Sequence, residues 1–231
     1  MYYGYYDYTY ILVIIGFIIT LIADLKVKSS YSKYKQIYSN KGLTGQDVAR
    51  KILDENGLEH IKIMEVAGTL TDHYDPTKKT VNLSTSVYKD SSIASIAVAA
   101  HECGHAIQDK VGYTFLRIRH KIVPTVNLCS KLGYFVVMIG LIFGMFELAL
   151  VGLILLSAIL IFQLVTLPVE FNASNRAKKE LVKLGIVDDS DYSGVKSMLT
   201  SAAMTYVAGL ASTLLQLLRM LLIVFSSRRD D

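Results

Sequence analysis

The sequence contains only two cysteines, Cys103 and Cys129, among its 231 residues. Two cysteines are too few for a disulfide framework, and their spacing provides no thiolate cluster for a metal. Charged residues are also scarce, at 19% of the chain, against about 25% in an average soluble domain. No internal repeat, low-complexity tract or long flexible linker is visible. These absences argue against a disulfide-stapled secreted domain and against a repeat protein.

Apolar residues are abundant: they make up 52% of the chain, and the mean hydropathy is +0.38. Four apolar runs approach the roughly 20 residues that a helix needs to cross a bilayer. They are residues 9–25, about 125–146, 148–167 and 197–227. The second and third lie back to back and predict a helical hairpin. The fourth contains Gln216 and Arg219, so it predicts either a span or a membrane-docked helix, because an arginine at membrane depth needs a partner or a route to the surface.

The first apolar run has two interpretations, a cleaved signal peptide or a retained anchor. Residues 1–10, MYYGYYDYTY, contain no lysine or arginine, and no A-x-A-like cleavage site follows the run. Their six tyrosines are typical of an aromatic belt at a membrane interface. We therefore expect a retained anchor.

Lysine and arginine are unevenly distributed. Of the 24, 15 lie between Lys26 and Lys121 and five more between Arg176 and Lys196, whereas the turn of the predicted hairpin carries none. The positive-inside rule then places both polar segments in the cytoplasm and the hairpin turn outside. Eleven acidic residues between Asp24 and Asp109 are interspersed among the basic ones, which argues against a nucleic-acid partner. The expected non-protein partner is the lipid bilayer.

The polar segment after the first run begins with signals for a helix. Thr44 is a suitable N-cap with Asp47 three residues on, and Gly57 follows the last apolar position. Residues 61–66, 68–74 and 81–84 predict three short strands, the first because it alternates apolar and polar side chains. We expect a small antiparallel sheet, in which the last strand, VNLS, offers an edge to an extended peptide.

The helix that follows carries the chemistry. It is predicted from about Ile93 through Asp109, with Ser91 or Ser92 as its cap, and it contains the sequence HECGH at 101–105. His101 and His105 are four residues apart, so both side chains leave one helical face and can bind one Zn²⁺ at about 2.0–2.1 Å each.

Two further residues of this motif support a catalytic zinc site. Glu102 lies beside the metal rather than on it, and it can act there as a general base; the pattern is that of H-E-x-x-H. Gly104 costs a helix about 1 kcal/mol, which suggests that a neighbouring segment approaches closely there.

A catalytic zinc site usually has three protein ligands, so a third must come from elsewhere. His120 lies in a basic stretch, His60 at a helix–strand junction, and His73 in an expected strand. Glu170 is the better candidate. It follows the third apolar run just after Pro168, where we expect a new helix segment to begin, and two membrane crossings return the chain to the side from which it left.

Three motifs in this order, DHYDP (72–76), HECGH (101–105) and LPVEFNAS (167–174), resemble the YugP-like family of neutral zinc metallopeptidases, which are multi-pass bacterial membrane proteins. The resemblance covers roughly residues 40–215. It implies His101 and His105 as zinc ligands and Glu102 as the general base.

The arrangement also resembles that of HtpX-type membrane proteases, in which a glutamate beyond a membrane hairpin completes the site. There an aspartate typically follows this glutamate by one helical turn, whereas here Ser174 stands at that place. Asn172, Asn175 and Arg176 are candidates to take over the orienting role. Candidate second donors to a reaction oxyanion are His73, Tyr74, Arg176 and Tyr206.

We therefore predict a mainly α membrane protein with about four transmembrane helices and a small cytoplasmic α+β zincin-like metallopeptidase unit. The expected segments are an anchor (1–25), a cytoplasmic segment with the HExxH helix (26–122), a transmembrane hairpin (123–167), a cytoplasmic segment with the third zinc ligand (168–196) and a C-terminal transmembrane or membrane-docked helix (197–231).

The predicted function is a zinc-dependent endopeptidase of the cell membrane whose active site faces the cytoplasm and whose substrate is a protein or peptide. The metal is Zn²⁺ held by His101, His105 and Glu170, with Glu102 catalytic. The alternative is a non-catalytic, zinc-stabilised binding or assembly protein, which Glu102 disfavours because a structural site needs no base. A transporter has only Gln216 and Arg219 in its favour, without an inverted repeat. The sequence predicts no oligomeric state.

Overall fold

A computed structural model describes residues 8–227 of the chain. The chain divides into two compact units. Residues 8–24, 118–166 and 205–227 form the first, here called the helical unit, and Leu25–Arg117 with Leu167–Met204 form the second, here called the mixed unit. Four of the tyrosines of the predicted aromatic belt lie in residues 1–7, outside the described residues.

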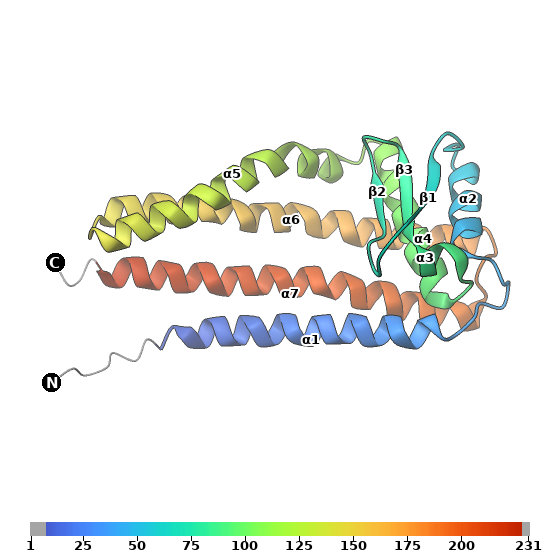
Figure 1. Cartoon of the computed structure of the whole chain (residues 1–231), viewed down its shortest axis with the longest axis horizontal. Helices are drawn as coiled ribbons and strands as arrows, with labels where there is room; N and C mark the ends of the chain where they lie inside the picture. Colours follow the sequence, from blue (N-terminus) through green and yellow to red (C-terminus); the bar gives the residue numbers. More distant parts are fainter. Residues whose placement is uncertain (1–7, 228–231) are drawn as a thin grey trace. The chain divides into compact units, whose positions relative to one another are not determined.

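The elements are predominantly helical (Figure 1). In chain order they are α1 (Tyr10–Lys35), α2 (Gly45–Glu55), β1 (Lys62–Val66), β2 (His73–Asp75), β3 (Thr80–Ser84), α3 (Thr85–Lys89), α4 (Ile93–Lys110), α5 (Thr114–Ile142), α6 (Phe146–Lys183) and α7 (Asp189–Ser227).

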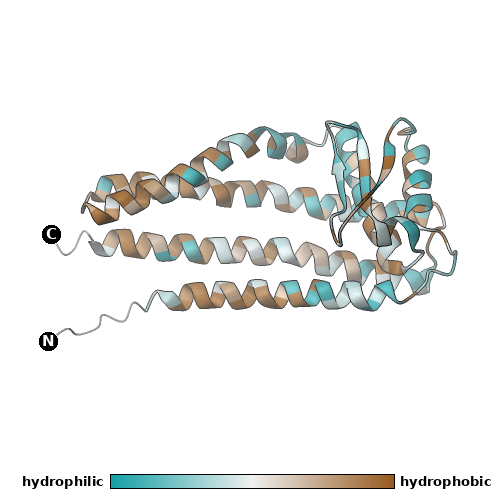
Figure 2. Ribbon diagram, in the orientation of Figure 1, coloured by the Kyte–Doolittle hydropathy of each residue, from teal (hydrophilic) through white to brown (hydrophobic). Residues whose placement is uncertain are grey.

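Four helices, α1, α5, α6 and α7, are long and apolar enough to cross a membrane. Their most apolar windows have mean hydropathies of 1.6 to 2.8, and only 6–22% of each window is buried within the protein. Figure 2 shows the apolar colour concentrated along these helices, while the short elements of the mixed unit carry most of the polar colour. Apolar side chains that the protein itself does not bury need another apolar surrounding, which a bilayer supplies. The prediction of four membrane-length helices is confirmed.

The predicted hairpin consists of α5 and α6, which pack through glycines. A Cβ added at Gly140 would lie 2.4 Å from the backbone nitrogen of Ala149, and one at Gly152 would lie 2.5 Å from that of Val137. The two backbones therefore approach more closely than any side chain would allow, which is the usual way for apolar helices to associate in lipid. Gly144, at φ +63° in the turn, reverses the chain.

Arg219, the residue that made the fourth run ambiguous, has an aromatic partner. Its guanidinium carbon lies 4.1 Å from the centre of the Tyr10 ring. Tyr10 is the first residue of α1, and Arg219 lies eight residues before the end of α7. A cation–π contact at a helix end is a much smaller burden for a membrane helix than an unpartnered charge at its middle.

The mixed unit forms locally as predicted. Thr44 caps α2, and its hydroxyl and the Asp47 carboxylate make the reciprocal bonds of a capping box. Ser92 caps α4 by accepting a hydrogen bond from the backbone of Ser95. The core is built from fully buried side chains of α2, β3 and α4 and of the neighbouring chain segments, among them Ile52, Leu53, Ile61, Leu83, Ile93 and Ile96.

The sheet differs from the antiparallel one that we predicted. Its strand order is β1-β3-β2, in which β2 pairs antiparallel with β3 but β1 pairs parallel with it. The chain reverses twice between β1 and β3, so β3 runs in the direction of β1. β3 is buried along its whole length and paired on both sides. The prediction that VNLS offers a free edge to a substrate is therefore wrong.

Pro168 also behaves differently from the prediction. It does not begin a new helix segment but lies inside α6, which continues without interruption to Lys183. A proline inside a helix removes one backbone hydrogen bond, and here packing outweighs that loss: Val169 and Glu170 are 0% and 2% exposed. The carbonyl of Val169 accepts a hydrogen bond of 2.8 Å from the Gln108 amide of α4. Because α6 is continuous, it fixes both the direction in which Glu170 points from the helix axis and its position along that axis.

Candidate metal centre

His101 and His105 form one side of a compact cluster on α4. Their ring centres lie 4.8 Å apart, with the ring planes at 87°. α4 is buried along most of its length, so these two imidazoles belong to a rigid element and not to a loop. The four-residue spacing has brought both rings to one face, as predicted.

Glu170 of α6 completes the cluster. Its Oε2 atom lies 3.3 Å from Nε2 of His101 and 3.6 Å from Nε2 of His105. Two ligand atoms that each bind one tetrahedral zinc at about 2.1 Å stand roughly 3.4 Å apart. The three side chains are the one group of metal-ligand type found among the described residues, and their ligand atoms all lie within 4.8 Å of one another. The donor set and the spacing therefore fit Zn²⁺.

A glycine allows Glu170 to reach the histidines. A Cβ added at Gly104 of α4 would lie 2.5 Å from the carbonyl oxygen of Ala173 on α6. No side chain fits there, so α4 and α6 touch through their backbones at the turn of α4 between the two histidines. The close approach expected from Gly104 is thus present, and the segment that makes it carries the third side chain of the cluster.

Ser174 orients His101. Its Oγ lies 3.1 Å from Nδ1 of that ring, and the serine is 5% exposed. When Nδ1 carries the ring proton and donates a hydrogen bond to the hydroxyl oxygen, the Nε2 lone pair is left to face Glu170. The contact to His101 is therefore made by Ser174 and not by one of the three candidates Asn172, Asn175 and Arg176.

Gln108, which was not among the residues predicted from the sequence, orients His105. Its Oε1 lies 3.0 Å from Nδ1 of His105, while its Nε2 donates to the Val169 carbonyl at 2.8 Å and to Oδ1 of Asn172 at 3.1 Å. Because both amide hydrogens are committed to α6, the oxygen must face the ring, and His105 donates from Nδ1. Gln108 is three residues after His105 on the same helical face, which was the available signal.

Asn172 and Arg176 extend this network rather than contact a histidine. The Arg176 guanidinium donates a hydrogen bond of 2.8 Å to the same Asn172 oxygen that accepts from Gln108. The amide of Asn172 is thereby held from two sides. The network ties the orientation of His105 to α6, the helix that also carries Glu170.

The surroundings of the cluster favour a positive charge. Burial alone would lower the pKa of the His105 imidazole, but the hydrogen bond to Glu170 and the negative charges of Glu102 and Glu170 outweigh it and raise that pKa. An environment that stabilises a proton on His105 also stabilises a metal cation in its place. Glu102 is 8% exposed and acts on His105 through its charge, which is consistent with a carboxylate beside the metal and not on it.

The cluster is reachable from solvent on its histidine side. The side chains of His101 and His105 retain 16% and 12% of their exposed surface, whereas that of Glu170 retains 3%. Structural zinc sites are closed by four protein ligands, and catalytic sites keep one position open. A group of three metal-ligand side chains with partly exposed imidazoles matches the second type.

The remaining candidates lie outside the cluster. His60, His73 and His120 are exposed and do not join it, and Nδ1 of His73 contacts the Thr71 carbonyl at 2.9 Å. The Tyr74 hydroxyl donates to Asp109 of α4 at 2.8 Å, and burial and this bond raise its pKa.

The DHYDP motif (72–76) therefore connects neighbouring elements of the mixed unit through hydrogen bonds. Tyr74 ties β2 to α4, and Asp72 accepts a hydrogen bond of 2.7 Å from the backbone of Ser84 at the end of β3.

Replacement of Gly104 by alanine tests the close approach. The added methyl group would meet the Ala173 carbonyl, so α6 must move away and carry Glu170 with it. We expect zinc affinity to fall by on the order of 10- to 100-fold, measured by competition with a chromophoric chelator in detergent. The control is Gly209→Ala in α7, where no atom lies closer than 3.9 Å to the new Cβ. Equal zinc affinity of both variants and the parent protein would contradict the proposed packing.

Comparison with known proteins identifies the family. The sequence profile of a family described as "Putative neutral zinc metallopeptidase" matches residues 9–225. The chain is 46% identical over 209 residues to a Bacillus subtilis (strain 168) protein named "Putative membrane protease YugP". The aligned region covers 90% of this chain and 93% of that protein. No solved structure matches the chain. The extent of both matches and the zinc-ligand geometry lead to one conclusion: the chain belongs to this family of neutral zinc metallopeptidases.

Proposed function

We propose that this protein is a membrane-integrated zinc endopeptidase that uses the centre formed by His101, His105 and Glu170 to hydrolyse peptide bonds. The observation that carries the proposal is the distance of 3.3 to 3.6 Å between Glu170 and both histidine Nε2 atoms, in a site with a free carboxylate, Glu102, on the adjacent helical position. Zinc, the cofactor of the family, would be held by the three side chains. When bound, it supplies Lewis acidity, which lowers the pKa of a coordinated water to about 7.

The residues of the chain then divide the remaining work. The Glu102 carboxylate accepts a proton from the attacking water and passes it to the nitrogen of the leaving amine. Ser174 and Gln108 keep both imidazoles in the tautomer that presents Nε2, through contacts of 3.1 Å and 3.0 Å. Because these partners are buried, with Gln108 0% exposed, the ring orientations are set before any ligand arrives.

Replacement of Glu102 by glutamine separates catalysis from metal binding. Glutamine keeps the size and the helix but accepts no proton, so we expect zinc content near that of the parent protein and peptide hydrolysis lower by on the order of 100-fold or more. Cleavage of casein in detergent, together with metal analysis, measures both. The matched control is Glu180→Gln, also on an α-helix of the mixed unit, whose carboxylate binds Asn56 at 3.0 Å.

The outcome also decides between the two functions that the sequence allows. A non-catalytic assembly protein would hydrolyse no casein, whether or not position 102 carries a carboxylate. Parent-like turnover in the Glu102→Gln protein would instead show that the base has been misassigned.

We further propose that the mixed unit faces the cytoplasm. The support is the charge distribution: 20 of the 24 lysines and arginines lie in the two polar segments and none in the hairpin turn, as the positive-inside rule requires of cytoplasmic loops.

Cysteine labelling in intact cells tests this orientation. In a chain without its two native cysteines, Thr77→Cys and Ser190→Cys stand at exposed positions of the mixed unit, and Met145→Cys stands in the hairpin turn, where the side chain is 51% exposed. We expect a membrane-impermeant maleimide to label only Met145→Cys until the cells are permeabilised. Labelling of Thr77→Cys or Ser190→Cys in intact cells would reverse the orientation.

A further inference from the structure

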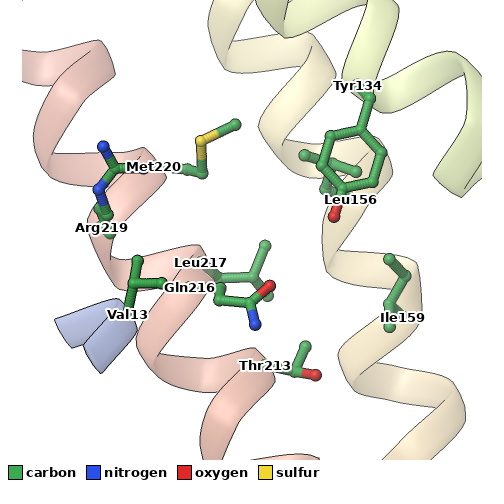
Figure 3. A pocket seen from close by; sticks show the side chains of 9 residues that line it. All are labelled: Val13, Tyr134, Leu156, Ile159, Thr213, Gln216, Leu217, Arg219 and Met220. Atoms are coloured by element: carbon green, nitrogen blue, oxygen red, sulfur yellow. The ribbon is translucent and has the colours of Figure 1, made fainter. Parts of the chain in front are cut away.

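The helical unit contains a cleft that the zinc chemistry does not use. It has a volume of about 410 Å³ and is lined by side chains of α1, α5, α6 and α7. Figure 3 shows Tyr134 of α5 and Leu156 and Ile159 of α6 on one wall, with Leu217 and Met220 of α7 among the residues of the other. Tyr134 is 55% exposed, so the cleft is open on its α5 side.

Polar groups line this otherwise apolar cleft. Figure 3 shows the Gln216 amide and the Thr213 side chain on the α7 wall and the Tyr134 hydroxyl reaching into the gap from α5. Within the described chain the Gln216 amide makes one hydrogen bond, a long one of 3.3 Å to Ser212 of its own helix. The hydroxyls of Tyr134 and Thr213 make none with the described residues. Such groups have unused hydrogen-bonding capacity in an apolar surrounding.

The polar face continues along α6 beyond the cleft. Gln163 and Thr166 follow Ile159 at intervals of four and three residues, which keeps them on one helical face. The Gln163 Oε1 atom and the Thr166 Oγ1 atom are buried without a hydrogen-bond partner among the described residues, and Thr166 is 5% exposed. Opposite them, a Cβ added at Gly209 of α7 would have only Gln163 within reach, at 3.9 Å. The seam is therefore polar and loosely filled.

Unpaired polar groups in a membrane-spanning region are costly, since lipid chains offer no hydrogen bonds. A transmembrane helix that carries serine, threonine, asparagine or glutamine does offer them, and such side chains bond across helices in membranes. The Arg219 guanidinium stacks on Tyr10 and points away from the Tyr134 wall (Figure 3). Apart from this arginine at its edge, the lining residues of the cleft offer only neutral donors and acceptors.

We propose that this cleft is a docking site for one transmembrane helix of a membrane-protein substrate, recognised by a neutral polar side chain within its apolar span. The inference rests on the proposed peptidase function and names its substrate class. A volume of about 410 Å³ takes side chains from one face of a helix, which then lies along the opening. Thr166 precedes Glu170 by four residues on α6, so the helix that recognises the span is also the one that carries the third zinc ligand.

Disulfide cross-linking in proteoliposomes tests the docking without requiring hydrolysis. The protease is a Glu102→Gln chain without native cysteines and with Thr213→Cys in the cleft. The substrate probes are two single-span reporters, one with a polyleucine span and one with a central asparagine, each with a cysteine one turn away. We expect the asparagine reporter to cross-link at least about tenfold more than the polyleucine reporter, and Gln163→Leu with Thr166→Val to abolish this difference.

Two controls keep the result interpretable. In the first control the cysteine is placed at Ile154 of α6 instead of at Thr213 of α7. Ile154 is 63% exposed, on the side of α6 that would face lipid, so Ile154→Cys should cross-link both reporters equally and weakly. Ser157→Ala removes a hydroxyl that bonds the carbonyl of Ile154 on its own helix at 2.6 Å and should leave the difference intact. Zinc content of one per chain in every variant shows that the fold persists.

Equal cross-linking of both reporters at Thr213→Cys overturns the proposal. Cross-linking between two protease chains at this position in the absence of reporter also overturns it, because a second copy would then fill the cleft. Failure of the parent protein to cleave casein would refute the peptidase function and leave the cross-linking result unaffected, so the two failures are distinguishable.

Discussion

The contact on which the site depends is the backbone approach of α4 and α6 at Gly104. A Cβ at that position would stand 2.5 Å from the Ala173 carbonyl, so the two helices can meet only because the side chain is a hydrogen atom. The approach brings one carboxylate of α6 within 3.3 Å and 3.6 Å of two imidazoles of α4. Glycine weakens a helix by about 1 kcal/mol, and here that loss is the condition for bringing the three side chains together.

The same contact explains how the imidazoles are held. Ser174 and the Gln108–Asn172 pair bridge the two helices from both sides of the cluster. Each ring nitrogen that does not face Glu170 is hydrogen-bonded by a group whose own position depends on the packing of α4 against α6. Ligand geometry and helix packing are thus one feature of the structure, and a change in either alters the other. The raised pKa of His105 has in part the same origin, since it reflects the Glu170 carboxylate that this packing brings to the ring.

The features that could be predicted from the sequence depend either on residues close together in the chain or on the number of predicted membrane crossings. The capping of α2 and α4 depends on residues three positions apart, and the shared face of His101 and His105 depends on helical periodicity. The grouping of Glu170 with the two histidines was predicted from the expectation that two spans return the chain to one side.

The features that were missed depend on distant partners. The sheet order requires β1 to pair with a strand that begins 14 residues after β1 ends, and the helix persists through Pro168 because α4 packs against the following turn. Gln108 has partners on α6 that lie 61 and 64 residues away in sequence, so its spacing from His105 indicated a shared face but no role.

Metal analysis of purified Glu170→Ala after dialysis shows whether Glu170 is the third zinc ligand. We expect zinc to fall well below one per chain, because only two histidines remain to bind it, while the protein stays folded in detergent. Glu180→Ala is the matched control, since it removes another carboxylate of α6 that binds Asn56 and not the cluster, and it should retain its zinc. One tightly bound zinc per chain in Glu170→Ala would rule out Glu170 as the third ligand.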